Sequence, residues 1–163
     1  MRVGIGFDVH RFGPERRLIL AGLEFDEEPG LLGHSDADVL THAVIDALLG
    51  AAGLGDIGQH FPDSDERWRD ASSIEMLMAV RRMLEARNYQ PVNVDVSLVA
   101  ERPRLAARVE AMRESLASAL GIAPAFVSIK ATTAEGLGAL GRGEGIAAWA
   151  VALIDRLEVP ELP

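Results

Sequence analysis

The sequence predicts an α+β fold, in which a single layer of helices covers a mixed, mainly four-stranded sheet. Three observations favour this class. The chain of 163 residues is 48% hydrophobic and has no repeats or linker, so one domain is expected over residues 1–163. Short apolar segments typical of strands occur near both ends and in the middle. Segments with helical spacing lie between them, in the order strand, strand, helix, helix, strand, helix, strand, strand.

Two strands are predicted near the start of the chain. Residues 2–10 form an apolar stretch, and residues 18–21 form a second, shorter one. An acidic turn is expected at residues 26–30, where Asp and Glu are followed by Pro and Gly.

Two helices are predicted to follow. The first covers residues 38–52 and ends near Gly53, because glycine commonly closes a helix. Ser35 or Asp36 is expected to cap its start, since either side chain can accept from the free N–H groups of the first turn. A turn-rich loop then leads to an amphipathic helix over residues 71–87.

The second half of the chain is predicted to add three strands and one helix. Residues 92–98 give the clearest strand pattern, because Val and Leu alternate there with Asn, Asp and Ser. A helix over about 105–120 and a strand over 127–132 follow. After a glycine-rich loop at 133–145, residues 146–157 are predicted to form a strand, with a helix as the competing interpretation.

Composition argues against several classes of function. A net charge of −9 disfavours a general affinity for DNA or RNA, which requires a basic face. No apolar run is long enough to span a membrane. Asp8 and His10 interrupt the segment where a signal peptide needs apolar residues, and cysteine is absent, so a cytoplasmic protein is expected. The lack of cysteine also removes thiolate metal ligands.

Asp8, His10 and His42 form a candidate metal site. Asp8 and His10 are two residues apart on a predicted strand, so their side chains leave the same face. His42 shares one side of its helix with Asp38 and Asp46. Two imidazoles, one carboxylate and an open fourth position match a catalytic zinc site, although manganese or iron also accepts these ligands. Spacing alone equally allows three ordinary polar residues.

A series of short motifs gives this site a context. In chain order the motifs are Gly6-Phe7-Asp8-Val9-His10, His34-Ser35-Asp36-Ala37-Asp38 with His42, Gly55-Asp56-Ile57-Gly58, Phe61-Pro62-Asp63, Lys130-Ala131-Thr132-Thr133-Ala134-Glu135 and Gly141-Arg142-Gly143-Glu144-Gly145. Together they resemble the 2-C-methyl-D-erythritol 2,4-cyclodiphosphate synthases of the non-mevalonate isoprenoid pathway. The resemblance extends over essentially the whole chain.

The resemblance implies a reaction and an assembly. The substrate would be 4-diphosphocytidyl-2-C-methyl-D-erythritol 2-phosphate, whose 2-phosphate attacks the β-phosphorus and expels CMP. The family is homotrimeric, with its sheets around a threefold axis and an active site at each subunit interface. No cytidylyltransferase domain is attached in this sequence, so the version with the synthase activity alone is expected.

The resemblance also implies which residues act on the phosphates. Zinc, or manganese, would be held by Asp8, His10 and His42. A second cation, magnesium or manganese, would bridge the substrate phosphates at Glu135. Ser35 matches a phosphate contact, and the residues that match transition-state stabilisers are His34 and Thr133. No separate base is needed, because the attacking phosphate is already largely ionised near neutral pH.

The remaining family matches concern the cytidine and the sugars. Residues 100–106 and 131–133 are expected to form the cytosine pocket. Asp56 and Asp63 are expected to bind ribose or erythritol hydroxyls, although both also fit ordinary turn chemistry. The further positions that match substrate-binding residues are Gly58, Ala100, Pro103, Arg104, Leu105, Ala131, Thr132 and Arg142.

Phe7, Arg142 and Glu144 match residues around a cavity on the threefold axis. There Arg142 would face an anionic isoprenoid diphosphate, with an interfacial Arg–Glu pair as the competing interpretation. Two residues depart from the family pattern. Ala139 stands where an aromatic residue is common, and Arg104 stands where Lys is common.

Other polar residues have open roles at this stage. Asp46 is expected either to orient the imidazole of His42 or to be a solvated or capping carboxylate. His34 also fits a loop histidine that caps the next helix. His60 is interpreted as incidental rather than as a metal ligand.

Two other classes of function compete with the synthase. A metal-dependent phosphohydrolase would use the same metal and release free phosphate or an uncyclised product. A non-catalytic trimeric binder of isoprenoid diphosphates would keep the Arg142 cavity but would not need the metal.

Overall fold

A five-stranded sheet forms the body of the protein in a computed structural model, which describes residues 1–157. The strands are β1 (Arg2–Leu20), β2 (Leu23–Leu31), β3 (Tyr89–Val99), β4 (Val127–Thr132) and β5 (Gly145–Arg156). They lie in the order β2-β1-β5-β3-β4, with β3 and β4 parallel and the other neighbours antiparallel. The predicted mixed sheet is therefore confirmed, and the closing segment is a strand.

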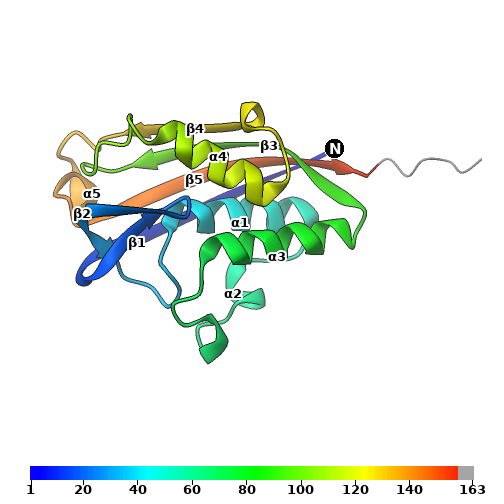
Figure 1. Cartoon of the computed structure of the whole chain (residues 1–163), viewed down its shortest axis with the longest axis horizontal. Coiled ribbons are helices and arrows are strands. Elements are labelled where there is room, and N and C mark those ends of the chain that lie inside the picture. Colours follow the sequence, from blue (N-terminus) through cyan, green and yellow to red (C-terminus); the bar gives the residue numbers. More distant parts are fainter. Residues whose placement is uncertain (158–163) are drawn as a thin grey trace, which may run out of the picture.

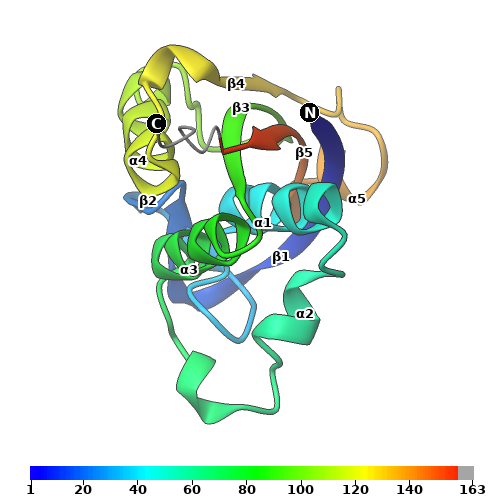
Figure 2. The same cartoon turned by 90° about the vertical axis from the view of Figure 1, so that its right-hand side faces the viewer.

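Helices cover one face of this sheet (Figures 1 and 2). The helices of the described residues are α1 (Val39–Ala52), α2 (Ile57–His60), α3 (Ser73–Glu85), α4 (Val109–Leu120) and α5 (Gly138–Gly141), with 3-10 turns at Glu66–Trp68 and Pro124–Phe126. The short α2 packs on α1, and the short α5 contacts β5. α1, α3 and α4 lie on the same side of the sheet, as expected for a single helical layer. None of the helices in the described part of the chain has the length and hydrophobicity that a transmembrane span requires.

The N-terminal strand is longer than predicted, and the sheet has five strands rather than mainly four. Residues 2–11 of β1 pair with β5, and residues 12–20 continue the same strand to pair with β2. The expected acidic turn at residues 26–30 was wrong, because those residues lie within β2. As an edge strand, β2 tolerates charged side chains and Pro29, which obscures the usual strand pattern. The turn between the two strands is at Ala21 and Gly22, both with positive φ.

The start of α1 is capped by a residue other than the two predicted. Asp38 is fully buried, and its carboxylate accepts from Thr41 N at 3.0 Å and from the Thr41 hydroxyl at 2.7 Å. The same carboxylate accepts from Gly22 N at 2.7 Å, which ties the helix to the β1–β2 turn. Burial and the neighbouring Asp36 raise the pKa of Asp38. Because Asp38 caps the helix, the side chains of Ser35 and Asp36 are available for contacts with the candidate metal centre described below.

Direct contact between β1 and α1 sets the position of that helix. A Cβ at Gly4 would lie 2.0 Å from Ala47 O, and a Cβ at Gly6 would lie 2.0 Å from Ala43 O. The helix backbone therefore rests on the strand backbone, which only glycine permits here. Side chains alternate along a strand, so Asp8 and His10 continue the helix-facing row that begins with these glycines.

The opposite face of the sheet is apolar and exposed in the single chain. Side chains on β1 and β5 make up this apolar face: Val3, Ile5, Phe7, Val9, Trp149 and Val151. Phe7 and Trp149 pack against each other across the two strands, with ring centroids 4.7 Å apart. Exposed apolar side chains gathered on one sheet face are typical of interaction surfaces.

Replacing Gly6 with Ala is expected to destabilise the fold. The added methyl group collides with the backbone of α1, and overpacking of this kind costs about 2 kcal/mol or more. Gly50→Ala is the matched control, because its Cβ would meet only Ile5 O at 3.8 Å while helix propensity favours Ala by up to about 1 kcal/mol. Urea unfolding measures both; equal stability of the two variants would contradict the close packing.

Candidate metal centre

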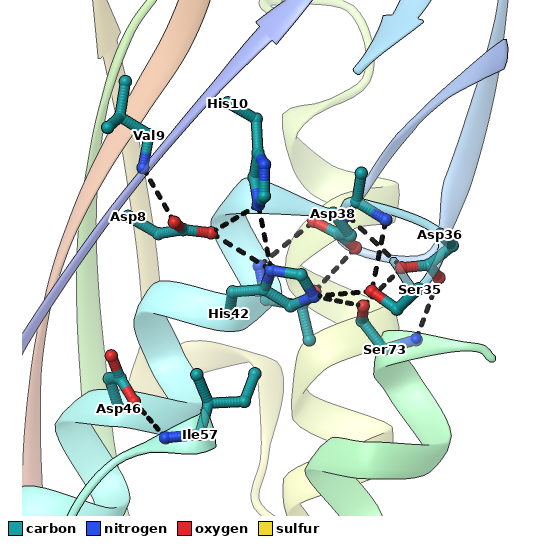
Figure 3. A network of polar contacts seen from close by, with 12 residues as sticks. Asp8, Val9, His10, Ser35, Asp36, Asp38, His42, Asp46, Ile57 and Ser73 are labelled. Atoms are coloured by element: carbon teal, nitrogen blue, oxygen red, sulfur yellow. Dashed lines mark hydrogen bonds and ion pairs between the residues drawn. The ribbon is translucent and has the colours of Figure 1, made fainter. Parts of the chain in front are cut away.

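The side chains of Asp8, His10 and His42 meet where β1 crosses the start of α1 (Figure 3). Asp8 Oδ2 lies 2.9 Å from His10 Nε2 and 3.0 Å from His42 Nδ1, and the two nitrogens are 3.2 Å apart. Two donors of a tetrahedral zinc ion with Zn–N bonds of 2.0–2.1 Å are separated by about 3.3 Å. The three atoms therefore have a spacing close to that of metal ligands.

Hydrogen bonds to the far side of each imidazole determine which nitrogen faces the centre. His10 Nδ1 lies 2.8 Å from Leu32 O, and since that carbonyl only accepts, Nδ1 carries a proton, so that Nε2 is the bare nitrogen whenever the imidazole is neutral. His42 turns Nδ1 toward Asp8, while its Nε2 lies 3.0 Å from the Ser35 hydroxyl and 2.9 Å from the Ser73 hydroxyl. Such outer contacts are typical of metal-bound histidine.

The ligand carboxylate and imidazole also shift each other's pKa. Burial alone would raise the pKa of Asp8, but hydrogen bonds and charge from His10 and His42 outweigh it and hold the pKa well below its usual range. Burial alone would lower the pKa of His10, but the hydrogen bond and charge of Asp8 raise it above the ordinary 6.5. Asp8 is therefore ionised, and its negative charge attracts a cation, either a proton on His10 or a metal ion.

A pocket of about 370 Å³ opens beside the three ligands. Its lining combines the predicted site residues His34, Ser35, Gly58 and Asp63 with an apolar wall of Ile57, Phe61, Trp68 and Met76. A candidate metal site, further polar groups and an apolar wall in one pocket are typical of a small-molecule site.

Asp46 lines the same pocket, and its carboxylate is hydrogen-bonded to α2 rather than to His42. Its carboxylate accepts from Ile57 N at 2.7 Å and so fixes the start of α2. Burial raises the pKa of Asp46. Of the two roles left open by the sequence, the structure favours the capping carboxylate.

Residues outside the motifs hold the His34 loop in place, and sequence reasoning missed them. Arg16 donates to Gly33 O at 3.0 Å and also to Ser35 O, and it pairs with Asp70 at 3.3 Å. Asp70 N donates to His34 O at 2.9 Å. An arginine in a polar strand segment gives no sequence signal for such a contact, because it links parts of the chain that meet only after folding.

A second hollow, of about 680 Å³, gathers the residues predicted to bind cytidine. Its lining includes Ala100, Pro103, Arg104, Leu105, Ala131, Thr132 and Thr133. Thr133 donates to Glu135 at 2.7 Å, and Glu101 accepts from Ala134 N at 2.9 Å. Glu101 lies in the predicted 100–106 segment and lines this hollow, but its contact with the loop that carries Thr133 and Glu135 was not predicted. This hollow shares no lining residue with the pocket beside the metal ligands.

Three further residues considered in the sequence analysis, Asp56, Arg142 and His60, line neither of these two pockets. Asp56 caps α2, accepting from Gln59 N at 3.0 Å and from the Gln59 side chain at 2.9 Å. Arg142 donates to Glu144 at 2.6 Å, which is the Arg–Glu pair considered as the alternative. His60 contacts Leu54 O at 2.8 Å, away from the metal ligands. Sugar binding by Asp56 and an axial role for Arg142 stay predictions.

Comparison with known proteins gives this arrangement a family context. The model of the YgbB family matches residues 1–155. A 2-C-methyl-D-erythritol 2,4-cyclodiphosphate synthase from Symbiobacterium thermophilum is 56% identical over 154 residues, covering 94% of this chain and 98% of that protein. A solved structure described as 2C-methyl-D-erythritol-2,4-cyclodiphosphate synthase (bound form CDP) aligns with a TM-score of 0.86 and 39% identity, covering 94% of this chain and all of that one.

Some relatives are longer than this chain. The bifunctional enzyme IspD/IspF from Anaeromyxobacter dehalogenans is 56% identical over 153 residues, which cover 94% of this chain. The matched region is 39% of that protein, so the chain spans about two fifths of the bifunctional relative.

Removing either ligand imidazole is expected to abolish metal binding. His10→Ala and His42→Ala each leave two of three protein ligands, which is too few for a tight zinc site. His60→Ala removes a histidine outside the cluster and is the matched control. Zinc content after dialysis should fall from one per chain to near zero only in the first two; equal zinc in all three would contradict the site.

Metal affinity is expected to fall in acid. Below the raised pKa of His10 its Nε2 is protonated and cannot bind a metal, whereas above it the nitrogen is free. Asp8 stays ionised throughout, because its pKa is lowered. Because one proton competes with the metal at His10, the zinc affinity should drop about tenfold per pH unit below the pKa of His10. Above that pKa the affinity should be constant. Competition with a chromophoric chelator measures this; a pH-independent affinity would contradict it.

Proposed function

The chain belongs to the YgbB family, and on that premise we propose that it is a 2-C-methyl-D-erythritol 2,4-cyclodiphosphate synthase. It converts 4-diphosphocytidyl-2-C-methyl-D-erythritol 2-phosphate into the cyclic diphosphate and CMP. The observation that carries this proposal is the Asp8, His10 and His42 cluster in a pocket that also contains His34, Ser35 and Asp63. The related synthase structure described as its CDP-bound form supports a cytidine nucleotide as part of the substrate.

The reaction is an intramolecular phosphoryl transfer. An oxygen of the 2-phosphate forms a bond to the β-phosphorus, and the bond from that phosphorus to the bridging oxygen breaks, so that this oxygen leaves with CMP. Both reacting groups are anionic, so catalysis consists mainly of positioning and charge neutralisation. A zinc ion bound by Asp8, His10 and His42 would supply Lewis-acid polarisation of a β-phosphate oxygen.

The chain's own residues position the phosphates around that centre. His34 and Ser35 line the pocket beside the ligands, within a loop held by Arg16 and Asp70. Each can donate a hydrogen bond to phosphate oxygens as charge develops. Ser35 is buried, so its hydroxyl is protected from competing water. Of the other lining residues, Asp63 would bind the erythritol hydroxyls, and Gly58 would contact the ribose or the erythritol end.

Thr133 and Glu135 are proposed to act from the cytidine half of the site. The carboxylate of Glu135 is a suitable ligand for magnesium or manganese, and Thr133 holds it through a hydrogen bond of 2.7 Å. Glu101 fixes the backbone between them through Ala134 N. The cytosine would lie in the hollow beside Pro103 and Arg104.

A homotrimer would unite the two halves of the site. The two pockets have no lining residue in common, so among residues 1–157 of one chain the pocket with the metal ligands does not include Thr133. The apolar face of β1 and β5 offers the surface for self-association. Phe7 lies on that face, and Arg142 and Glu144 would border the threefold axis, where an isoprenoid diphosphate could bind Arg142.

Product analysis tests the reaction. Zinc- and magnesium-loaded protein should convert the substrate to CMP and a cyclic diphosphate, seen by ³¹P NMR as two coupled resonances without free phosphate. His34→Ala and Thr133→Ala are each expected to lower kcat by about a hundredfold, the scale of one lost transition-state donor. A linear phosphate product or free phosphate would favour the phosphohydrolase and contradict the synthase.

Disrupting the apolar face tests the interfacial site. Ile5→Glu places a charge on a side chain that is 70% exposed in the single chain, and is expected to yield monomers without synthase activity. These monomers should still bind zinc, because Asp8, His10 and His42 belong to one chain. Met78→Glu, on α3 at 37% exposure, is the control and should stay trimeric in sedimentation equilibrium. An active Ile5→Glu monomer would contradict the shared site.

A further inference from the structure

Ser73 contacts the functional site from outside the pocket. It is the first residue of α3 and is fully buried, and its hydroxyl lies 2.9 Å from His42 Nε2. The same hydroxyl donates to Asp36 Oδ1, while Ser73 N donates to Asp36 Oδ2 at 2.8 Å. Figure 3 shows the resulting series of contacts from Asp36 through Ser73 to His42.

We propose that Ser73 is a positioning residue that, together with Asp36, holds His42 with its Nδ1 directed at the metal. A serine hydroxyl has a single proton, and an ionised carboxylate only accepts. The Ser73 proton is therefore committed to Asp36. Toward His42 the Ser73 oxygen can only accept, so Nε2 must carry the proton of that contact and Nδ1 is the nitrogen available as a ligand.

Ser35 contacts the same nitrogen but has a different role. Its hydroxyl lies 3.0 Å from His42 Nε2 and accepts from Ala37 N at 3.3 Å, but it contacts no carboxylate in the described part of the chain. Its proton is therefore not committed to an acceptor among those residues. Ser35 also lines the pocket, whereas Ser73 does not. Ser35 thus faces the substrate, and Ser73 supports the ligand from behind.

The position of Asp36 explains why this support is rigid. Asp36 Oδ1 also accepts from Asp38 N at 3.2 Å, and Asp36 N donates to Ala71 O at 3.0 Å. The carboxylate therefore joins the start of α1 to the start of α3. Hydrogen-bonded series that run from a carboxylate to a metal-bound imidazole fix ring orientation and increase metal affinity.

Removing the Ser73 hydroxyl tests this role, which presupposes the metal site of the proposed function. Ser73→Ala keeps the backbone bond to Asp36 and deletes only the hydroxyl. We expect the zinc Kd, measured by chelator competition without substrate, to rise about 10- to 100-fold. Ser35→Ala is the matched control. Its expected change in zinc Kd is less than about threefold, because the Ser73 oxygen still accepts from His42 Nε2. Unchanged affinity in Ser73→Ala, or an equal loss in Ser35→Ala, would overturn the proposal.

A second variant and a spectroscopic measurement separate positioning from a structural role. Asp36→Asn should also weaken zinc binding, and the double variant should be no weaker than Ser73→Ala, because the two residues act in series. If the losses of zinc affinity in the two single variants added up in the double variant, Asp36 and Ser73 would not act in series. In zinc-loaded protein with ¹⁵N-labelled histidine, the His42 Nε2 proton should exchange with water faster in Ser73→Ala than in wild type. Unchanged exchange would also contradict the proposal.

These outcomes are independent of the reaction itself. If the chain made no cyclic product but Ser73→Ala still weakened zinc binding, the proposed function would fail and the positioning role would hold. If wild-type protein bound no zinc, both would fail.

Discussion

The structure depends on the direct contact between the backbones of β1 and α1. Gly4 and Gly6 leave no side chain between strand and helix, so Ala43 and Ala47 rest on the strand. His42 precedes Ala43, and Asp8 follows Gly6 by one strand repeat. The same contact that packs the helix therefore brings a strand carboxylate and a helical imidazole to within 3.0 Å. A larger residue at either glycine would move the helix away and separate the ligands.

Charge and hydrogen bonds at this contact between β1 and α1 favour the binding of a cation. Asp8 supplies the negative charge, and the backbone carbonyl of Leu32 and the hydroxyls of Ser35 and Ser73 bind the outer nitrogens of the two histidines. A cation thereby meets bare nitrogen atoms beside an ionised oxygen. The adjoining pocket carries the hydrogen-bond donors His34 and Ser35 close to the metal ligands. The nearby carboxylate of Asp46 accepts a hydrogen bond from Ile57 N. A cation site next to hydrogen-bond donors suits the binding of anionic phosphate groups.

Much of this arrangement was predictable from the sequence, and the exceptions have physical causes. Alternation revealed β3, and Asp8 with His10 indicated a shared strand face next to His42. The length of β1 and the extent of β2 were not predicted, because polar residues and Pro29 at a sheet edge do not alternate. Ser73 and Arg16 were missed, and the loop contact of Glu101 was not predicted, since these roles come from contacts between segments distant in sequence. Motif resemblance, rather than periodicity, indicated the cytidine hollow.

A single metal ion at Asp8, His10 and His42 is what would make this chain a cyclodiphosphate synthase. The most direct test is to remove zinc with a chelator in the presence of magnesium and then restore it stepwise while measuring CMP release. Activity should disappear on chelation and return in proportion to bound zinc, reaching its maximum at one zinc per chain. Full activity in zinc-free protein, or recovery unrelated to zinc occupancy, would contradict this role of the metal.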